Sequence, residues 1–295
     1  MKPKMYVITL MCNPSKPILT NDLVSKYCQT FEGISVTWLN DGVAADITVS
    51  EIPNEFKKYW LELQASKIDM VIQKEKYRKK RLLVADMDST IIEQESLDEL
   101  AYEAGCGKKI SEITKQAMEG KLEFEDALNR RVEYLKGTPI STIKKVMKNR
   151  ITLSPSARTL ISTMRKNNVY TALISGGFTH FTTKISQELG FNESKANQFE
   201  IRNEKLTGVV KSPILGKEAK VDFIRTLTKK FGLSSIDVIA VGDGANDIGM
   251  LELAGSGIAM HAKEIVQSKA KIIINHSDLS ALLYIQGYNF NEFIN

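Results

Sequence analysis

Residues 82–90, LLVADMDST, decide the fold class of this 295-residue chain. The first four, Leu82–Ala85, form a fully apolar run, as expected of a strand that is covered on both faces. Two similar runs lie further along the chain, at 169–174 and 236–241, and helical stretches separate the three. Strands that alternate with helices predict a doubly wound parallel α/β sheet of the Rossmann-like kind.

Each of these runs ends in an unusual polar sequence: DMDST at 86–90, SGG at 175–177 and GDGAND at 242–247. Ligands bind beyond the carboxyl ends of parallel strands, so neighbouring strands would bring the three loops to one crevice. Taken singly, the loops have plainer interpretations: a strand end leading into a helix cap, a loop, and a glycine-rich turn. The third fits neither a GxGxxG loop nor an EF-hand, because Asp247 and Ala245 occupy positions that need other residues.

Four carboxylates would meet in this crevice, from Asp86, Asp88, Asp243 and Asp247. Two like charges roughly 4 Å apart repel by about 4 kcal/mol at an effective dielectric constant of ~20. The cluster therefore needs protons or a cation, and ligation by oxygen alone suits Mg²⁺. We expect Mg²⁺ as the cofactor.

The same loops also carry groups that bind anions. The Ser175 hydroxyl and the Gly176 amide can donate hydrogen bonds to phosphate oxygens, and a lysine, either Lys217 or Lys220, would neutralise further charge. Carboxylates, a metal ion, amide donors and a lysine together describe a site for phosphoryl transfer.

Within such a site we expect the first two aspartates to have different catalytic roles. Asp86, at the strand end, is the natural nucleophile, because a carboxylate can attack phosphorus and form an aspartyl phosphate. Asp88, two residues on, would project to the same side of an extended chain. It is the expected general acid for the leaving oxygen and then the base for the incoming water.

The N-terminal quarter of the chain has a different pattern. Residues 1–75 show the order βαββαβ, with a hairpin signal at Asn40-Asp41-Gly42, and resemble ferredoxin-like domains of the ACT type. Residues 76–81 belong to a basic run that we expect to be a solvated linker. Residues 82–295 would form the α/β core, and a helical excursion at about 93–150 is too long for a simple crossover and is interpreted as a cap.

The composition of the chain bears on its binding partners and on its cellular location. A net charge of +5 and 43% apolar residues favour neither a nucleic acid nor a membrane as partner. Cys12, Cys28 and Cys106 are odd in number and lack CxxC spacing, which indicates reduced thiols. No apolar stretch approaches the ~20 residues that span a bilayer. The N-terminal apolar run is short for a signal peptide, so we expect a cytoplasmic protein.

The three loops together resemble the motifs of the haloacid dehalogenase superfamily. DMDST matches its DxDx[TV] nucleophile motif, Ser175 its second-motif hydroxyl, and GDGAND its acidic third motif. The resemblance runs from about residue 82 to the C-terminus. It implies a phosphatase or phosphotransferase, and the helical insertion places the chain in the subclass with a helical cap.

Longer stretches closely resemble the phosphoserine phosphatase family of this superfamily. They are DMDSTIIEQESLDELAYEAG, SGGFTHF and VGDGANDIGML. This resemblance implies that Glu95 contacts the substrate ammonium, that Arg131 binds its carboxylate and that Phe124 packs over the site. It further implies that Lys220 binds the phosphate, with Lys217 as a competing assignment, and that Asn246 hydrogen-bonds the transferring group.

The resemblance also implies how the metal is held and what reaction occurs. Asp243 would bind Mg²⁺ together with Asp86 and the backbone carbonyl of Asp88, with Asp247 nearby. The expected reaction is the hydrolysis of O-phospho-L-serine to L-serine, the last step of serine biosynthesis. Alternatives are a relative that uses another small phosphomonoester, a phosphotransferase that forms phosphohomoserine, and a non-catalytic amino-acid sensor. A homodimer and serine binding at residues 1–75 are left open.

Overall fold

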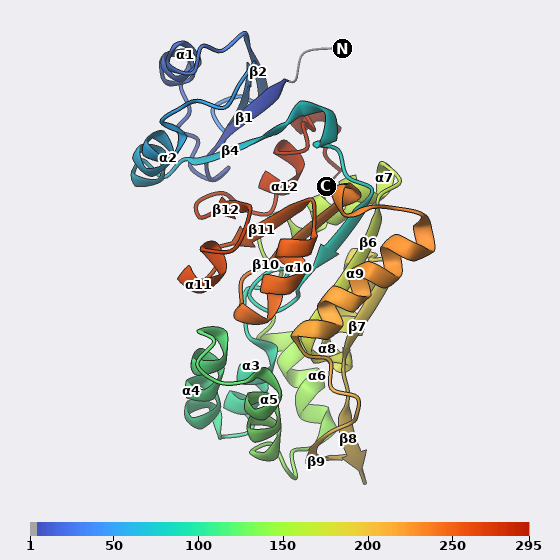
Figure 1. The fold of residues 1–295 in the computed structure, drawn as a ribbon. Helices are drawn as coiled ribbons and strands as arrows, with labels where there is room; N and C mark the ends of the chain where they lie inside the picture. The colour runs from blue at the N-terminus through green and yellow to red at the C-terminus, as the bar shows by residue number, and fades with distance from the viewer. Residues whose placement is uncertain (1–4, 295) are drawn as a thin grey trace.

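A six-stranded sheet forms the centre of the computed structural model, which describes residues 5–294 (Figure 1). Residues 1–4 and 295, at the outer ends of the two expected domains, lie outside the described part. The strand order is β12-β11-β10-β5-β6-β7, and each neighbouring pair is parallel, which confirms the predicted doubly wound sheet. The strands are β5 (Leu82–Ala85), β6 (Tyr170–Phe178), β7 (Glu193–Asn197), β10 (Val238–Gly242), β11 (Ser256–Met260) and β12 (Ile272–Ile274).

The three strands predicted from apolar runs are immediate neighbours in this sheet. β5 lies between β10 and β6, so their carboxyl ends meet as expected. All four residues of β5 are fully buried, and they alternate between the cores on the two faces of the sheet. The SGG sequence at 175–177 differs from expectation, because β6 continues to Phe178 through an irregularity in its pairing with β7.

Helices cover both faces of the central sheet. One face packs against α7 (Ala157–Lys166), α8 (Thr179–Leu189) and α12 (Ala281–Tyr284). The other packs against α9 (Lys217–Phe231), α10 (Ile248–Leu253) and α11 (Glu264–Gln267). Among the described residues, no helix combines the length and the apolar character that crossing a membrane requires.

The chain between β5 and α7 forms the helical cap, drawn in green at the end opposite the N-terminal sheet (Figure 1). Its helices are α3 (Ser96–Glu103), α4 (Gly107–Met118), α5 (Phe124–Glu133) and α6 (Ile140–Asn149). A hairpin that the sequence analysis did not foresee, β8 (Phe199–Arg202) and β9 (Lys205–Val210), lies against α5. Leu206 also exchanges backbone hydrogen bonds with Gly137 and Thr138, so the hairpin extends the cap.

The N-terminal part has the predicted order βαββαβ. Its elements are β1 (Tyr6–Met11), α1 (Asn21–Thr30), β2 (Ser35–Asn40), β3 (Ala44–Val49), α2 (Phe56–Ala65) and β4 (Asp69–Lys74). The antiparallel sheet has the order β2-β3-β1-β4. Side chains alternate along β1: Ile8 and Leu10 pack with the helices, whereas Met11 joins the core of the central domain.

The basic run between the two sheets is solvated only in part, because Lys76, Tyr77, Lys79 and Arg81 are exposed whereas Arg78 and Lys80 are largely buried. Arg78 pairs with Asp46 at 2.6 Å and donates to the backbone carbonyls of Tyr284 and Ile285, each at 3.1 Å. These carbonyls lie at the end of α12, where they also accept from the Gly287 N–H and the Gln73 side chain, respectively. Burial lowers the pKa of Lys80 to about 8. The run therefore fixes the N-terminal sheet to the central domain.

Candidate active site

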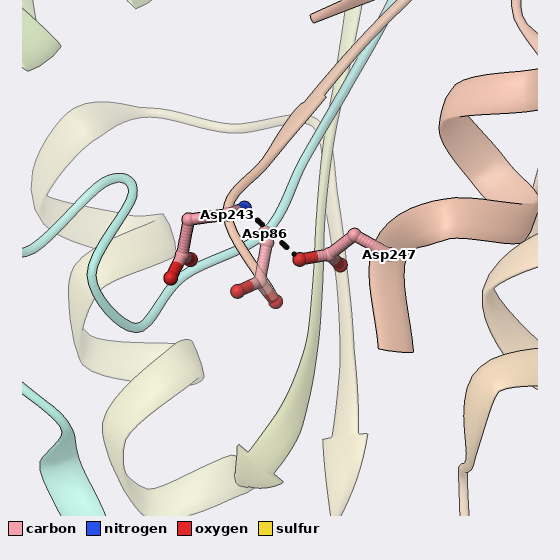
Figure 2. A group of neighbouring side chains, drawn as sticks. All are labelled: Asp86, Asp243 and Asp247. Atoms are coloured by element: carbon pink, nitrogen blue, oxygen red, sulfur yellow. Dashed lines mark hydrogen bonds between the residues drawn. The ribbon is translucent and has the colours of Figure 1, made fainter. Parts of the chain in front are cut away.

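Three aspartates meet at the carboxyl edge of the central sheet. Asp86 follows β5, Asp243 follows β10, and Asp247 ends a short helical turn, η3 (Ala245–Asp247). Each offers a carboxylate oxygen, and these atoms lie within 4.8 Å of one another. Figure 2 shows Asp86 between the other two. The three residues are at most 4% exposed, so the predicted convergence of the first and third loops is confirmed.

Lys220 on α9 is the cation of this cluster. Its Nζ donates to Asp86 Oδ1 at 2.5 Å and to Asp247 Oδ1 at 2.6 Å. Burial alone would lower the pKa of Lys220, but Asp247 and Asp86 outweigh burial and raise it. Lys217 instead lies at the rim, 59% exposed, with its Nζ 3.8 Å from Glu123.

One lysine does not balance three buried carboxylates. When ionised, the cluster of Asp86, Asp243, Asp247 and Lys220 has a formal charge of −2. Burial, with the charge of Asp247, raises the pKa of Asp86 well above its usual range despite Lys220. Burial, with the charges of Glu95, Asp247 and Asp86, does the same for Asp243. A divalent cation would offset this excess charge, so the residues present fit Mg²⁺.

The three carboxylates differ in how many oxygens are already engaged. Asp247 uses both: Oδ1 accepts from Lys220, and Oδ2 accepts from the backbone N–H groups of Asp243 and Gly244 at 3.2 and 3.0 Å. Lys220 occupies one oxygen of Asp86, and Thr90 donates to one oxygen of Asp243. Within residues 5–294, Asp86 and Asp243 each keep one oxygen without a hydrogen-bond partner, while Asp247 bonds to Lys220 and to the backbone of the third loop.

Asp88 is not in the group of three aspartates whose oxygens lie within 4.8 Å of one another, but it lines the same pocket as Asp86. Its Oδ1 accepts from the Ser96 backbone N–H at 2.7 Å, and its Oδ2 accepts from Ser175 Oγ at 3.0 Å. The Ser175 oxygen accepts in turn from the Gly177 N–H at 2.8 Å. A Cβ added to Gly177 would lie 2.8 Å from Asp88 Oδ2, so any larger residue there would displace the Asp88 carboxylate. The second loop thus holds the carboxylate of Asp88.

A pocket of about 130 Å³ lies between the central domain and the cap. Pockets for drug-sized ligands typically measure ~300–1,000 Å³, so this one suits a small molecule. The central domain contributes Asp86, Asp88, Gly176, Gly177, Lys217 and Asn246, and the cap contributes Glu95, Leu97, Phe124, Leu128 and Arg131, among others. A Cβ added to Gly176 would lie 2.6 Å from the ring of Phe124, which shows how closely the cap approaches β6.

Two opposite charges in this pocket have no direct ion-pair partner within residues 5–294. Among these residues, no carboxylate oxygen lies within 4 Å of the Arg131 guanidinium, although Arg131 is only 7% exposed, and no cation lies that near Glu95. Glu95 Oε1 accepts from Ser89 Oγ at 2.7 Å. Burial, with the charge of Asp88, raises the pKa of Glu95 to about 7. The pocket therefore presents separate sites for a cation and an anion.

The sequence analysis missed residues that hold the site together. Asn197 is buried at the end of β7; its Nδ2 donates to the carbonyl of Gly176 at 2.9 Å and its Oδ1 accepts from the Leu215 N–H at 2.7 Å. It thus joins the second loop to the segment that leads into α9. A lone asparagine without a motif around it gives no signal in a single sequence.

The haloacid dehalogenase-like hydrolase model matches residues 83–252, more than half of the chain. The chain therefore belongs to this family, as the three loops and the Rossmann-like sheet indicate.

Within the family, the chain is similar to phosphoserine phosphatases. It is 42% identical over 205 residues to the phosphoserine phosphatase of Archaeoglobus fulgidus, a match that covers 70% of this chain and 59% of that protein. It thus spans less than two thirds of that relative's length. A solved structure described as a phospho-aspartyl intermediate analogue of phosphoserine phosphatase is 41% identical, with a TM-score of 0.67, over 70% of this chain and 98% of that one.

A second solved structure includes the N-terminal part as well. It is a HAD family hydrolase from Salmonella enterica serovar Typhi, 32% identical, with a TM-score of 0.84 over 96% of this chain and 98% of that one. The attachment of the N-terminal sheet to a haloacid dehalogenase core is therefore shared with another member of the family.

Proposed function

We propose that this protein is a Mg²⁺-dependent phosphatase that hydrolyses O-phospho-L-serine to L-serine and phosphate. The observation that carries the proposal is that Glu95 and Arg131, which have no ion-pair partner within residues 5–294, line one pocket with Asp86. Phosphoserine has an ammonium for the first and a carboxylate for the second, and a planar guanidinium binds carboxylates with two parallel hydrogen bonds. The similarity to phosphoserine phosphatases supports the same substrate.

Asp86 begins the reaction in this proposal. Its free carboxylate oxygen attacks phosphorus, the bond between phosphorus and the seryl oxygen breaks, and Asp88 donates its proton to that oxygen. Asp88 then takes a proton from a water molecule, which attacks the phosphorus of the aspartyl phosphate and releases Asp86 and phosphate. The bond from Ser175 and the backbone of Ser96 orient the Asp88 carboxylate for both transfers.

The remaining polar groups stabilise the charge on the phosphoryl group. Lys220 lies against Asp86 and would neutralise one phosphoryl charge, while the Gly176 amide and the Asn246 side chain face the pocket as donors. When bound, Mg²⁺ supplies charge neutralisation at the phosphoryl oxygens. Asp86, Asp243 and the carbonyl of Asp88 would hold it, with Asp247 beside them.

A role in serine biosynthesis and a cytoplasmic location, which the three free cysteines favour, belong to the same proposal. Serine binding at the N-terminal sheet and homodimer formation stay predictions.

Phosphate release from a panel of esters tests the substrate. We expect the highest kcat/KM for O-phosphoserine, with lower values for phosphohomoserine, phosphoethanolamine and sugar phosphates. A preference for a sugar phosphate would contradict the proposal. Transfer of phosphate from phosphoserine to added homoserine, in place of release to water, would indicate the phosphotransferase alternative.

A further inference from the structure

Arg131 is held in place by a polar group that is not an acid. Its Nε donates to the Ala127 carbonyl at 3.3 Å, and its Nη1 donates to the Thr114 hydroxyl at 3.1 Å. A guanidinium has five N–H donors, so these two bonds leave others free on the side that lines the pocket. A buried cation without a direct counter-ion is costly, which makes the position suited to an anionic ligand.

The Thr114 hydroxyl also forms a hydrogen bond with a carboxylate, that of Asp98. It donates to Asp98 Oδ1 at 2.5 Å, while the Ile110 carbonyl, its other acceptor within reach, is 3.1 Å away. A carboxylate is the stronger acceptor of the two, so we assign the single hydroxyl proton of Thr114 to the bond with Asp98. The three groups belong to three helices, α3, α4 and α5, and Thr114 is buried between them.

The hydroxyl also acts as a spacer. If Asp98 contacted Arg131 directly, a carboxylate and a guanidinium would form a bidentate pair and occupy the planar fork that a ligand needs. With Thr114 between them, Asp98 still provides negative charge and a fixed geometry, but it does not compete for the outer N–H groups.

We propose that Thr114 and Asp98 are positioning residues that orient Arg131 toward the substrate carboxylate, and so set the preference for phosphorylated amino acids. This inference rests on the proposed function. It predicts an effect restricted to substrates that carry a carboxylate, because Thr114 and Asp98 act through Arg131 alone.

Two esters separate this role from general support of the cap. O-Phosphoserine and O-phosphoethanolamine share the phosphate and the ammonium, but only the first has a carboxylate. We expect Thr114→Val, which removes the hydroxyl at nearly constant shape, to raise KM for phosphoserine roughly tenfold, as for the loss of a hydrogen bond to a charged group. We expect kcat for phosphoserine, and kcat/KM for phosphoethanolamine, to change less than about twofold.

Further variants provide controls. Thr114→Ser keeps the hydroxyl and should restore KM. Thr30→Val removes a hydroxyl in exposed α1, where Thr30 donates to the Lys26 carbonyl at 2.8 Å, and should change the kinetics with neither substrate. Asp98→Asn should raise KM in the same direction, and combined with Thr114→Val it should add little, because both belong to one chain of hydrogen bonds. Asp98→Asn alone also tests the proposal if Thr114→Val fails to fold.

The results distinguish two failures. A wild-type protein that does not prefer phosphoserine over phosphoethanolamine would refute the proposed substrate and with it this assignment. If the preference exists but Thr114→Val and Asp98→Asn lower kcat/KM for both substrates equally, or change it for neither, the proposed function stands and the positioning role is wrong.

Discussion

Replacing Lys220 by methionine tests the charge balance of the aspartate cluster. Lys220→Met removes the buried ammonium that lies 2.5 Å from Asp86 and 2.6 Å from Asp247. At an effective dielectric constant of ~20, each contact is worth about 6–7 kcal/mol before desolvation. Desolvation offsets much of this, and removing one partner of a buried pair costs about 3–5 kcal/mol net. We expect the free energy of unfolding to fall by that amount near neutral pH in EDTA.

Urea denaturation followed by circular dichroism measures this change, with Lys217→Met as the matched control. Lys217 lies one turn earlier on α9, and its exposed contact with Glu123 should contribute about 0–1 kcal/mol. With Mg²⁺ present, Lys220→Met should lower kcat at least ~10²-fold, and Lys217→Met much less. Equal effects of the two variants on stability and activity, or a larger effect of Lys217→Met, would refute the reasoning.

Four further predictions concern the same pocket. The pKa of Glu95 is raised from its usual 4.5 to about 7, so the folded state binds this proton more tightly than the unfolded chain. The folded state therefore loses stability as pH rises from 4.5 to about 7. In EDTA, the stability of Glu95→Gln should increase relative to the wild type over this pH range, and a constant difference would contradict this. Because the ionised form binds an ammonium, KM for phosphoserine in the wild type should also fall as pH rises through about 7, and a KM that rises would count against Glu95 as the ammonium site. EDTA should abolish phosphate release and added Mg²⁺ should restore it, whereas activity without any metal would overturn the charge argument for Asp86 and Asp243. Gly177→Ala places a Cβ 2.8 Å from Asp88 Oδ2 and should lower kcat about 10²-fold without unfolding the protein, and unchanged kcat would show that the Ser175–Asp88 contact is dispensable.

The parts of the fold that could be predicted are those with local signals. β5 begins and ends where its apolar run does, because a strand buried on both faces needs apolar residues throughout. The N-terminal order βαββαβ also follows from apolar periodicity and from the turn at Asn40-Asp41-Gly42. The three loops could be placed together because their strands share one direction.

Features that depend on distant partners could not be predicted. Arg78 belongs to a run of charges that resembles a solvated linker, and only the fold brings the end of α12 and Asp46 to it. The β8–β9 hairpin consists of short strands that are stabilised by contact with α5, so its own sequence gives little signal.

The site residues that belong to sequence motifs could be predicted, whereas a choice between neighbouring residues depends on the three-dimensional structure. Lys217 and Lys220 lie one turn apart on α9, and their spacing alone does not say which reaches Asp86; in the structure Lys220 does. Asp247 stays a predicted metal ligand: it belongs to the group of three aspartates that could hold an ion, and both of its oxygens also accept hydrogen bonds. The hydrogen bond from Arg131 to Thr114 depends on the packing of three helices, which no local sequence pattern predicts.

The most direct test of the account is phosphate release from O-phosphoserine by Asp86→Asn, measured beside the wild type at saturating Mg²⁺. The substitution keeps the shape of the side chain and removes the attacking oxygen anion. The account predicts a loss of at least ~10⁴-fold in kcat, as expected when a nucleophile is removed. Activity within about tenfold of the wild type would contradict it, because no aspartyl phosphate could then lie on the pathway.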